Sequence, residues 1–381
     1  MSNTKPESTK RLCVVYNFAQ LYREPIFKLI DKEWECDWYF GKNSTDIKEM
    51  DTSLLKHVER VDTKRLIGPI EWQSKIGGLI RKKEYDKFLM LGEPMVASTW
   101  WLLIQKKLFY RKKKVYLWTH GWYGREGVAK KWLKRIFFGM ADHVFTYGEY
   151  AKNEAIKQGF NKGYITPIHN SLNHDYQVKL RKDLTPSRVY KDYFGNDDPT
   201  LLFIGRLTTV KRLDLLLKAV ALLRGRGKTY NVVIIGSGEK KEELKSLVDD
   251  LDLNRNVWFY GQSYDDRVNA QLIYDADLCV APGNVGLTAM HTMVFGTPVL
   301  THDDFKWQMP EFEAINIGKT GNFFKKDSVN SISDSIEEWL ESHRDSRSFV
   351  REACFREIDS QWTPEYQISI LQHIIDDYGS K

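Results

Sequence analysis

Short apolar runs alternate along the whole chain with longer stretches that repeat apolar residues at helical spacing. Each run is nearly all apolar and bounded by Gly, Asn or Pro, which is typical of strands covered on both faces of a parallel sheet. The runs lie at residues 12–18, 37–40, 87–91, 114–120, 143–147, 164–170, 200–205, 231–236, 256–261, 277–283 and 297–302. Their alternation with helical stretches such as 211–227 and 239–253 predicts an α/β protein.

The length of 381 residues indicates two domains, at about 150 residues per domain. A polar segment with Pro and Gly at 183–200 is typical of a domain boundary. We therefore expect a first domain over 1–190, a second over 191–362 and a C-terminal helix over 363–381. Two open sheets side by side predict a cleft, and ligands of such folds bind beyond the carboxyl ends of the strands.

The composition is that of an ordinary globular protein, with 42% hydrophobic and 28% charged residues, which excludes a disordered chain. No apolar run approaches the roughly 20 residues that cross a bilayer. The N-terminus carries no apolar core of a signal peptide, so none is expected. Four cysteines form no CxxC pair, and we expect reduced thiols in a cytoplasmic protein. They are Cys13, Cys36, Cys279 and Cys354.

Charge is divided unequally between the two halves. Residues 1–190 hold 35 Lys and Arg against 21 Asp and Glu, which leaves 22 basic and 30 acidic residues for the rest. Segments 98–114 and 127–140 are basic and carry Trp and Phe, so each indicates either a helix at an anionic lipid surface or a core helix with solvated charges. We expect contact with a membrane surface. No nucleic-acid-binding motif is present and the second half is acidic, so nucleic acid is not an expected partner.

Two cations follow the apolar run at 200–205. Arg206 and Lys211 lie between this strand and the next helix, in GRLTTVKR beginning at Gly205. Two cations at the carboxyl end of a strand suit a diphosphate, although solvated surface charges are the alternative.

A glycine-containing turn follows the run at 277–283. Gly283, Asn284 and Gly286 open a helix there. Glycine lets the backbone approach a ligand closely, and a helix start presents N–H groups suited to phosphate. An ordinary strand-to-helix junction is the alternative.

The order and spacing of the second-half motifs closely resemble the nucleotide-sugar-binding domain of family 4 glycosyltransferases of GT-B fold. The motifs are GR-x4-K, IIGSGE, NVWFYG, ADLCVAP, GL and FGTPV within residues 200–325. In the first half, 141–160 and 168–175 are similar to that family's end-of-domain segment. The resemblance implies two Rossmann-like parallel-sheet domains that face each other across a cleft, with the C-terminal helix crossing back to the first domain.

The resemblance also implies roles for single residues. Arg206 and Lys211 match the diphosphate-binding pair, and His120, in LWTHGW, matches a cleft histidine that faces the donor sugar; these three are the expected catalytic residues. Gly286 and Leu287 match a turn whose amides approach the phosphates and ribose. The expected donor-binding residues are Gly205, Gly261, Tyr264, Gly283, Asn284, Gly286, Leu287, Thr288 and His291.

One departure from the family pattern concerns two glutamates that lie eight residues apart in relatives. Gly283 and His291 occupy those positions here. A neutral His291 accepts one ribose hydrogen bond but not two. Asn284 or Thr288 is expected to substitute for the first carboxylate.

The function implied by the resemblance is a retaining, metal-independent glycosyltransferase, similar to those of bacterial surface-polysaccharide synthesis. The expected donor is a nucleotide-diphosphate sugar, with UDP as the nucleotide. The expected acceptor is a glycan or lipid-linked glycan that faces the first domain, whereas the second domain is expected to bind the nucleotide sugar. The expected location is the inner face of the cell membrane. The alternatives are a degenerate nucleotide- or glycan-binding assembly protein and a nucleotide-sugar epimerase. Further cleft candidates, with polar turns as their alternative, are Asn17, Gln20, His169, Asn170 and His174.

Overall fold

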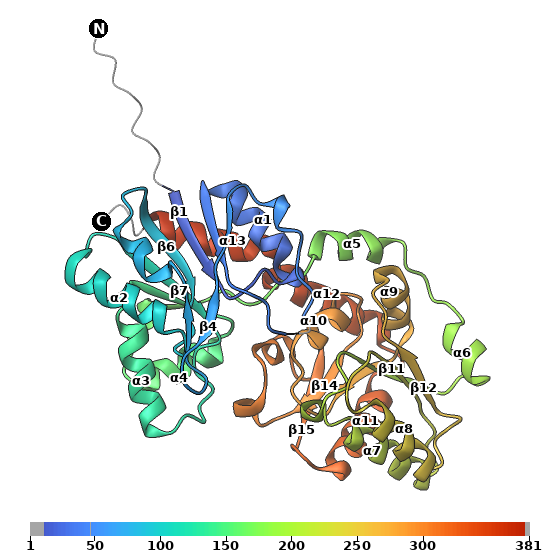
Figure 1. The fold of residues 1–381 in the computed structure, drawn as a ribbon. Coiled ribbons are helices and arrows are strands. Elements are labelled where there is room, and N and C mark those ends of the chain that lie inside the picture. Colours follow the sequence, from blue (N-terminus) through green and yellow to red (C-terminus); the bar gives the residue numbers. More distant parts are fainter. Residues whose placement is uncertain (1–10, 46, 378–381) are drawn as a thin grey trace. The chain divides into compact units, whose positions relative to one another are not determined.

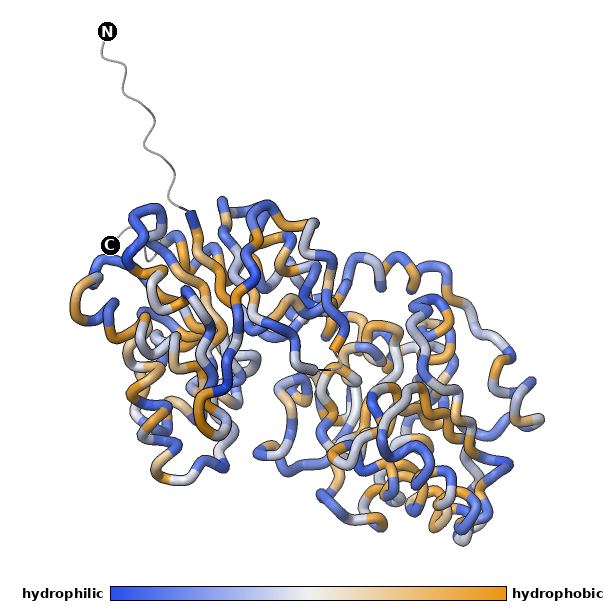
Figure 2. The backbone as a smooth tube through the Cα atoms, viewed as in Figure 1, coloured by the Kyte–Doolittle hydropathy of each residue, from blue (hydrophilic) through white to orange (hydrophobic). Residues whose placement is uncertain are grey.

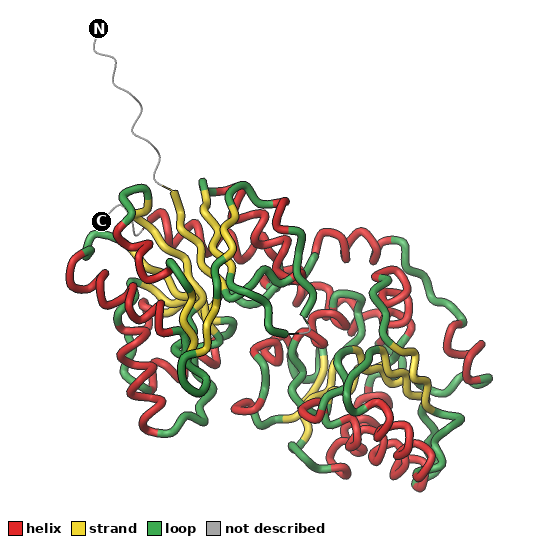
Figure 3. The backbone as a smooth tube through the Cα atoms, in the orientation of Figure 1, coloured by secondary structure: helices red, strands yellow, loops and turns green. Residues whose placement is uncertain are grey.

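The computed structural model describes residues 11–45 and 47–377, which form two compact units (Figure 1). The first unit comprises the chain up to Leu172 together with the segment from Pro364 onward. The second unit comprises Asn173–Thr363. In each unit, strands lie side by side with helices around them (Figure 3).

The first unit is built on a seven-stranded parallel sheet in the order β3-β2-β1-β6-β7-β8-β9. Its strands are β1 (Arg11–Tyr16), β2 (Cys36–Phe40), β3 (Val58–Arg60), β6 (Tyr85–Leu91), β7 (Lys114–Thr119), β8 (His143–Thr146) and β9 (Ile165–Pro167). The order reverses between β1 and β6, and this reversal is the switch point where open α/β sheets bind ligands.

Helices cover both faces of this sheet, which is why its strands are apolar at successive positions. Val14 and Tyr16 pack on one face with α1 and α13, whereas Cys13 and Val15 pack on the other with α2 and α3. The helices are η1 (Leu21–Arg23), α1 (Glu24–Glu33), η2 (Thr52–Leu54), η3 (Ile76–Arg81), α2 (Ala97–Phe109), α3 (Val128–Gly139), α4 (Glu149–Lys157), η4 (Lys162–Tyr164) and α13 (Pro364–Asp377).

The second unit repeats the design with six parallel strands in the order β12-β11-β10-β13-β14-β15. They are β10 (Thr200–Ile204), β11 (Asn231–Ile235), β12 (Val257–Gly261), β13 (Leu278–Ala281), β14 (Val299–His302) and β15 (Gly321–Phe324). The helices are α5 (His174–Lys182), α6 (Val189–Phe194), η5 (Thr209–Lys211), α7 (Leu213–Gly225), α8 (Lys241–Asp250), α9 (Asp266–Asp275), α10 (Leu287–Met293), η6 (Phe305–Trp307), η7 (Pro310–Ala314), α11 (Val329–Ser342) and α12 (Arg347–Gln361). The switch point lies between β10 and β13.

The predicted α/β class with two parallel sheets is confirmed, and every apolar run contains a strand. Four strands were not predicted. They are β3, β15 and the antiparallel pair β4 (Thr63–Arg65) and β5 (Glu71–Gln73). Each is only three or four residues long, and three of the four are polar, so they lack the continuous apolar signal of a doubly covered strand.

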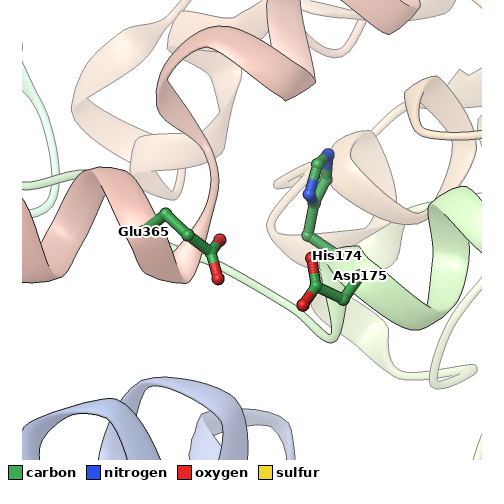
Figure 4. A group of neighbouring side chains, drawn as sticks. All are labelled: His174, Asp175 and Glu365. Atoms are coloured by element: carbon green, nitrogen blue, oxygen red, sulfur yellow. The ribbon is translucent and has the colours of Figure 1, made fainter.

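The compact units divide the chain at 172/173, whereas the polar segment at 183–200 predicts a boundary at 190/191. The difference lies in α5, which is fastened to α12 of the second unit. Arg181 donates two hydrogen bonds to Asp359, of 3.1 and 2.7 Å, and the His174 ring lies 2.7 Å from the same carboxylate. His174 therefore anchors α5. Figure 4 shows His174 and Asp175 in the first turn of α5, and Glu365 in the first turn of α13.

The C-terminal helix α13 belongs to the first unit. Leu371, Ile374 and Ile375 are buried in the core that also holds α1. Gln367 is buried at the same helix, where its Nε2 donates to the His169 carbonyl at 2.8 Å. This bond fixes the segment that leads out of β9.

Hydrophobic and hydrophilic segments alternate along the coloured part of the backbone (Figure 2). Among residues 11–45 and 47–377, no helix is both long and apolar enough to span a bilayer. All four cysteines lie in this part of the chain, and each is buried without a disulfide partner.

Candidate functional site

Two loops at the switch point of the second unit touch backbone to backbone. The loop after β10 carries Val210 and Lys211, and the loop after β13 carries Gly283. The Gly283 N–H donates to the Lys211 carbonyl at 3.0 Å. A Cβ on residue 283 would lie 1.9 Å from the Val210 carbonyl oxygen, so only glycine allows this contact.

Glycines bring the neighbouring loops equally close. A Cβ on Gly236, after β11, would lie 1.9 Å from the Gly205 carbonyl oxygen, and the Gly236 N–H donates to the Gly261 carbonyl at 2.8 Å. A Cβ on Gly238 would lie 2.4 Å from the Leu207 carbonyl oxygen. The carboxyl-end edge of this sheet therefore has close main-chain contacts at Gly236, Gly238 and Gly283.

Lys211 links the two switch-point loops through its side chain. Its Nζ donates to the Asn284 carbonyl at 2.7 Å, to Asn284 Oδ1 at 2.9 Å and to the Val285 carbonyl at 3.4 Å. These three acceptors match the three protons of an ammonium group. The Nζ also lies 3.7 Å from the position of a Cβ on Gly286. Lys211 thus places a positive charge directly beneath the glycine turn.

The charges around Lys211 act in opposite directions. Burial is the main cause that lowers the pKa of Lys211 to about 8, and the cationic Arg206 adds to this effect. The carboxylate of Glu311, buried in η7, raises the pKa. The structure therefore brings the two predicted cations together, with Arg206 exposed at the surface. Glu311 lies close to Lys211 as well, although no sequence motif marks Glu311 as a site residue.

Two buried polar residues hold the β13–α10 loop in place. The Val285 N–H donates to Gln308 Oε1 at 2.8 Å, and Gln308 Nε2 donates to Thr301 Oγ1 at 2.8 Å. Thr301 in turn donates to the Ala281 carbonyl at 2.8 Å. The loop is thus braced from β14 and from the segment after it. Neither Gln308 nor Thr301 was a candidate from sequence, since each reaches the loop only through tertiary contacts.

Thr288 and His291 on α10 have different surroundings. The Thr288 hydroxyl donates to the Ile204 carbonyl at 2.7 Å, so it holds α10 against the end of β10. His291 is half-buried, and burial lowers its pKa to about 4, which keeps the imidazole neutral near pH 7. Within the described part of the chain, the His291 ring has no hydrogen-bond partner. His291 is therefore the better placed of the two to bond a ligand.

The segment expected to contact the base follows β12. Gly261 has a φ of 93°, a backbone conformation that favours glycine. Tyr264 is 74% exposed, and its hydroxyl accepts a hydrogen bond from Gln262 Nε2. The assigned roles of Gly261 and Tyr264 stay predictions.

His120 follows β7 in the first unit. Its Nδ1 is buried without a hydrogen-bond partner among the described residues, and its ring centroid lies 4.6 Å from that of Tyr147. Burial, and secondarily the positive charge of Arg23, lower the pKa of His120 to about 4. The imidazole is therefore neutral near pH 7.

Arg23 is a buried cation that the sequence analysis did not identify. It is 4% exposed, and its guanidinium carbon lies 5.1–5.4 Å from the ring centroids of Tyr16, Tyr22, Trp118 and Tyr147. One of its nitrogens donates to the Tyr147 hydroxyl. No carboxylate pairs with it within residues 11–45 and 47–377. The aromatic faces stabilise this charge without neutralising it.

The remaining cleft candidates bond to their own neighbours. Gln20 Nε2 donates to Asn17 Oδ1 at 2.9 Å, and Asn170 Oδ1 accepts from the Ser171 N–H at 3.0 Å. His169 is buried, and burial lowers its pKa to about 4.

Helix α3 presents an apolar stripe to the surface of the first unit. Val128, Trp132 and Ile136 are four residues apart and 86%, 66% and 37% exposed. Helix α2 lies next to α3, because the Trp100 and Phe137 rings pack at 5.0 Å. It exposes Trp101, Leu108 and Phe109.

Residues 191–354 match the protein family described as "Glycosyl transferases group 1". An uncharacterized glycosyltransferase of Methanocaldococcus jannaschii is 32% identical over 108 residues, which make up 28% of this chain and 27% of that protein. The poly(ribitol-phosphate) alpha-N-acetylglucosaminyltransferase of Staphylococcus aureus is 26% identical over 136 residues, 35% of this chain and 26% of that protein. The chain therefore spans about a quarter of the curated relatives that it matches.

A solved structure resembles the chain over nearly its whole length. The crystal structure of Anabaena HepE in complex with UDP covers 97% of this chain and 100% of its own, with a TM-score of 0.71 and 15% identity. At this level of identity the similarity concerns the fold. It agrees with the two Rossmann-like units and confirms the expected GT-B class.

Proposed function

We propose that the protein is a retaining glycosyltransferase, supported by the match of residues 191–354 to the family described as "Glycosyl transferases group 1". It moves a sugar from a nucleotide-diphosphate sugar to a hydroxyl of a glycan or lipid-linked glycan. The proposed process is surface-polysaccharide synthesis. UDP is the proposed nucleotide, supported by the HepE structure, whose described ligand is UDP.

One observation carries the proposal: the Lys211 ammonium lies beneath the turn formed by Asn284, Val285 and Gly286, at the switch point of the second unit. Ligands of open α/β sheets bind at this place. A diphosphate there meets the charges of Lys211 and Arg206 and the amides of the glycine turn. These groups stabilise the charge that develops as the diphosphate departs.

In the proposed step, the bond between the sugar's anomeric carbon and the diphosphate oxygen breaks. The acceptor oxygen forms its bond to the same carbon on the same face, which retains the configuration. The acceptor proton passes to a β-phosphate oxygen, so the reaction requires no protein base. Since Lys211 and Arg206 supply the positive charge, we propose that no metal ion is required.

His120 acts in this proposal as a neutral hydrogen-bonding group for the donor sugar. A neutral imidazole offers one donor and one acceptor nitrogen, which suits a sugar hydroxyl. The nearby charge of Arg23 opposes protonation of His120 and so preserves both functions.

We further propose that the first unit binds the surface of a membrane through α2 and α3. The exposed stripe of Val128, Trp132 and Ile136 suits the lipid interface. Lys130 and Lys131 are exposed in the same helix and suit anionic headgroups, which contribute about 1 kcal/mol for each basic residue near the surface.

The proposal is tested by donor binding and sugar transfer with purified full-length protein. UDP or a UDP-sugar is expected to raise the unfolding temperature, because a ligand that binds only the folded state stabilises it. Lys211→Met and Arg206→Met are each expected to lower the transfer rate by about 10²–10³-fold, as the loss of one charge-stabilising group does. Lys245→Met, at an exposed lysine of α8 paired with Glu242, is the matched control. Wild-type rates in both site variants would remove the assignment.

A further inference from the structure

A polar cavity in the first unit has a volume of about 710 Å³. It lies at the carboxyl ends of β1 and β6, which flank the switch point of this sheet. Its polar lining includes Asn17, Lys42, Thr63, Arg65, Glu71 and Gln73. The volume falls in the range of roughly 300–1,000 Å³ that is usual for small-molecule sites.

The hairpin of β4 and β5 turns four polar side chains toward this cavity. Thr63 pairs with Gln73 and Arg65 pairs with Glu71 across the hairpin. Because side chains two residues apart share one face of a strand, all four lie on the same face. Lys64 lies between Thr63 and Arg65, on the opposite face of the hairpin.

Because Gly41 has no side chain, the hairpin can pack closely against the end of β1. A Cβ on Gly41 would lie 2.5 Å from the Asn17 carbonyl oxygen and 2.7 Å from both Thr63 Oγ1 and Gln73 Nε2. Gln73 is buried, and its Nε2 donates to the Tyr16 carbonyl at 3.3 Å. These close contacts hold the wall of the cavity in place.

The charged side chains of this wall form no ion pairs with one another. Lys42, Arg65 and Glu71 form no ion pair within residues 11–45 and 47–377, although Arg65 and Glu71 face each other in register. Thr63 Oγ1 is buried and has no hydrogen-bond partner among these residues. Among the described lining residues, two cations and one carboxylate thus give an excess of positive charge.

We propose that this cavity binds the acceptor and that the acceptor is an anionic saccharide, a sugar or polyol unit bearing a phosphate or a carboxylate. Lys42 and Arg65 bind the anionic group, since Arg and Lys are the side chains that pair with phosphate and carboxylate. Glu71 accepts hydrogen bonds from sugar hydroxyls. The inference rests on the proposed transferase function and specifies its acceptor.

The charge of the surrounding chain agrees with an anionic acceptor. The first 190 residues hold 35 basic against 21 acidic residues. Such an excess raises the local concentration of anions and speeds their association, and the effect weakens with salt. Transfer to an anionic acceptor is therefore expected to slow as ionic strength rises, more than transfer to a neutral one.

The test compares acceptors that share one saccharide and differ only in a phosphate, a carboxylate or neither group. Transfer from a UDP-sugar is measured with the wild type and with Lys42→Gln/Arg65→Gln. The double variant is expected to raise KM for the charged acceptor by about tenfold or more, because two charge-assisted contacts are lost. It leaves KM for the neutral saccharide and the affinity for UDP unchanged. Whichever of the phosphate and carboxylate acceptors loses affinity identifies the anion.

Lys64→Gln is the matched control, because this lysine lies on the other face of the same strand. An unchanged unfolding temperature shows that the double variant folds. If UDP binds and transfer occurs, but neutral and charged acceptors are used equally and the double variant changes neither, the acceptor inference is overturned while the transferase function stands. Absence of both UDP binding and transfer in the wild type would instead overturn the proposed function.

Discussion

The affinity for UDP is expected to fall as the pH rises through 8, because diphosphate binding requires a protonated Lys211. The pKa of Lys211 in the free protein is lowered to about 8, chiefly by burial. A bound diphosphate favours the ammonium form and raises this pKa, so binding takes up a proton above pH 8. At pH 9 about a tenth of the free protein carries the charge, against about nine tenths at pH 7, and the affinity is expected to be about tenfold lower.

Isothermal titration of UDP between pH 7 and pH 9 measures this change. Repeating the titration in buffers of different ionisation enthalpy counts the protons taken up. Lys211→Arg is the informative variant, because arginine keeps its charge throughout this range and so removes this contribution to the pH dependence. A wild-type affinity that stays constant from pH 7 to pH 9, with no proton uptake, would refute the placement of the diphosphate at Lys211.

Three further predictions concern the loop contact at Gly283, the exposed surface of α3 and the need for a metal ion. Gly283→Ala is expected to destabilise the protein by about 1–3 kcal/mol in a urea titration and to weaken UDP binding, because its Cβ would lie 1.9 Å from the Val210 carbonyl oxygen. Gly225→Ala, where no atom lies within 4 Å of the added carbon, is the control, and equal stability of the two variants would contradict the close loop contact. Trp132→Gln is expected to weaken sedimentation with vesicles of anionic lipid, whereas a vesicle affinity equal to that of the wild type would remove α3 from the membrane surface. EDTA is expected to leave the transfer rate unchanged, and a loss restored by added Mg²⁺ would contradict the proposed metal independence.

The fold could be predicted because helices cover both faces of each sheet, so that strands such as β1 and β11 are apolar at successive positions. The β4–β5 hairpin could not be predicted, because its six residues are polar or half-exposed and contain no apolar run. The sequence therefore pointed to Asn17 of the polar lining but not to the hairpin side of the first-unit cavity. Its charged residues come together only through the register of the hairpin, which places Arg65 opposite Glu71.

The proposed donor site was predictable where the local sequence determines the local geometry. Gly283 and Lys211 lie next to strand ends, and the parallel sheet brings those ends to one edge. Glu311 and Gln308 reach the same place from the segment after β14, which has no spacing that indicates a ligand site. Arg23 precedes a helix and resembles a surface residue in sequence, and its burial depends on aromatic rings from distant strands.

A crystal structure with bound UDP would show where the diphosphate lies. We expect it at the carboxyl ends of β10 and β13, within hydrogen-bond distance of Lys211 Nζ and of the main-chain amides that follow Gly286. A diphosphate bound elsewhere on the second unit, with Lys211 still bonded only to Asn284 and Val285, would contradict it.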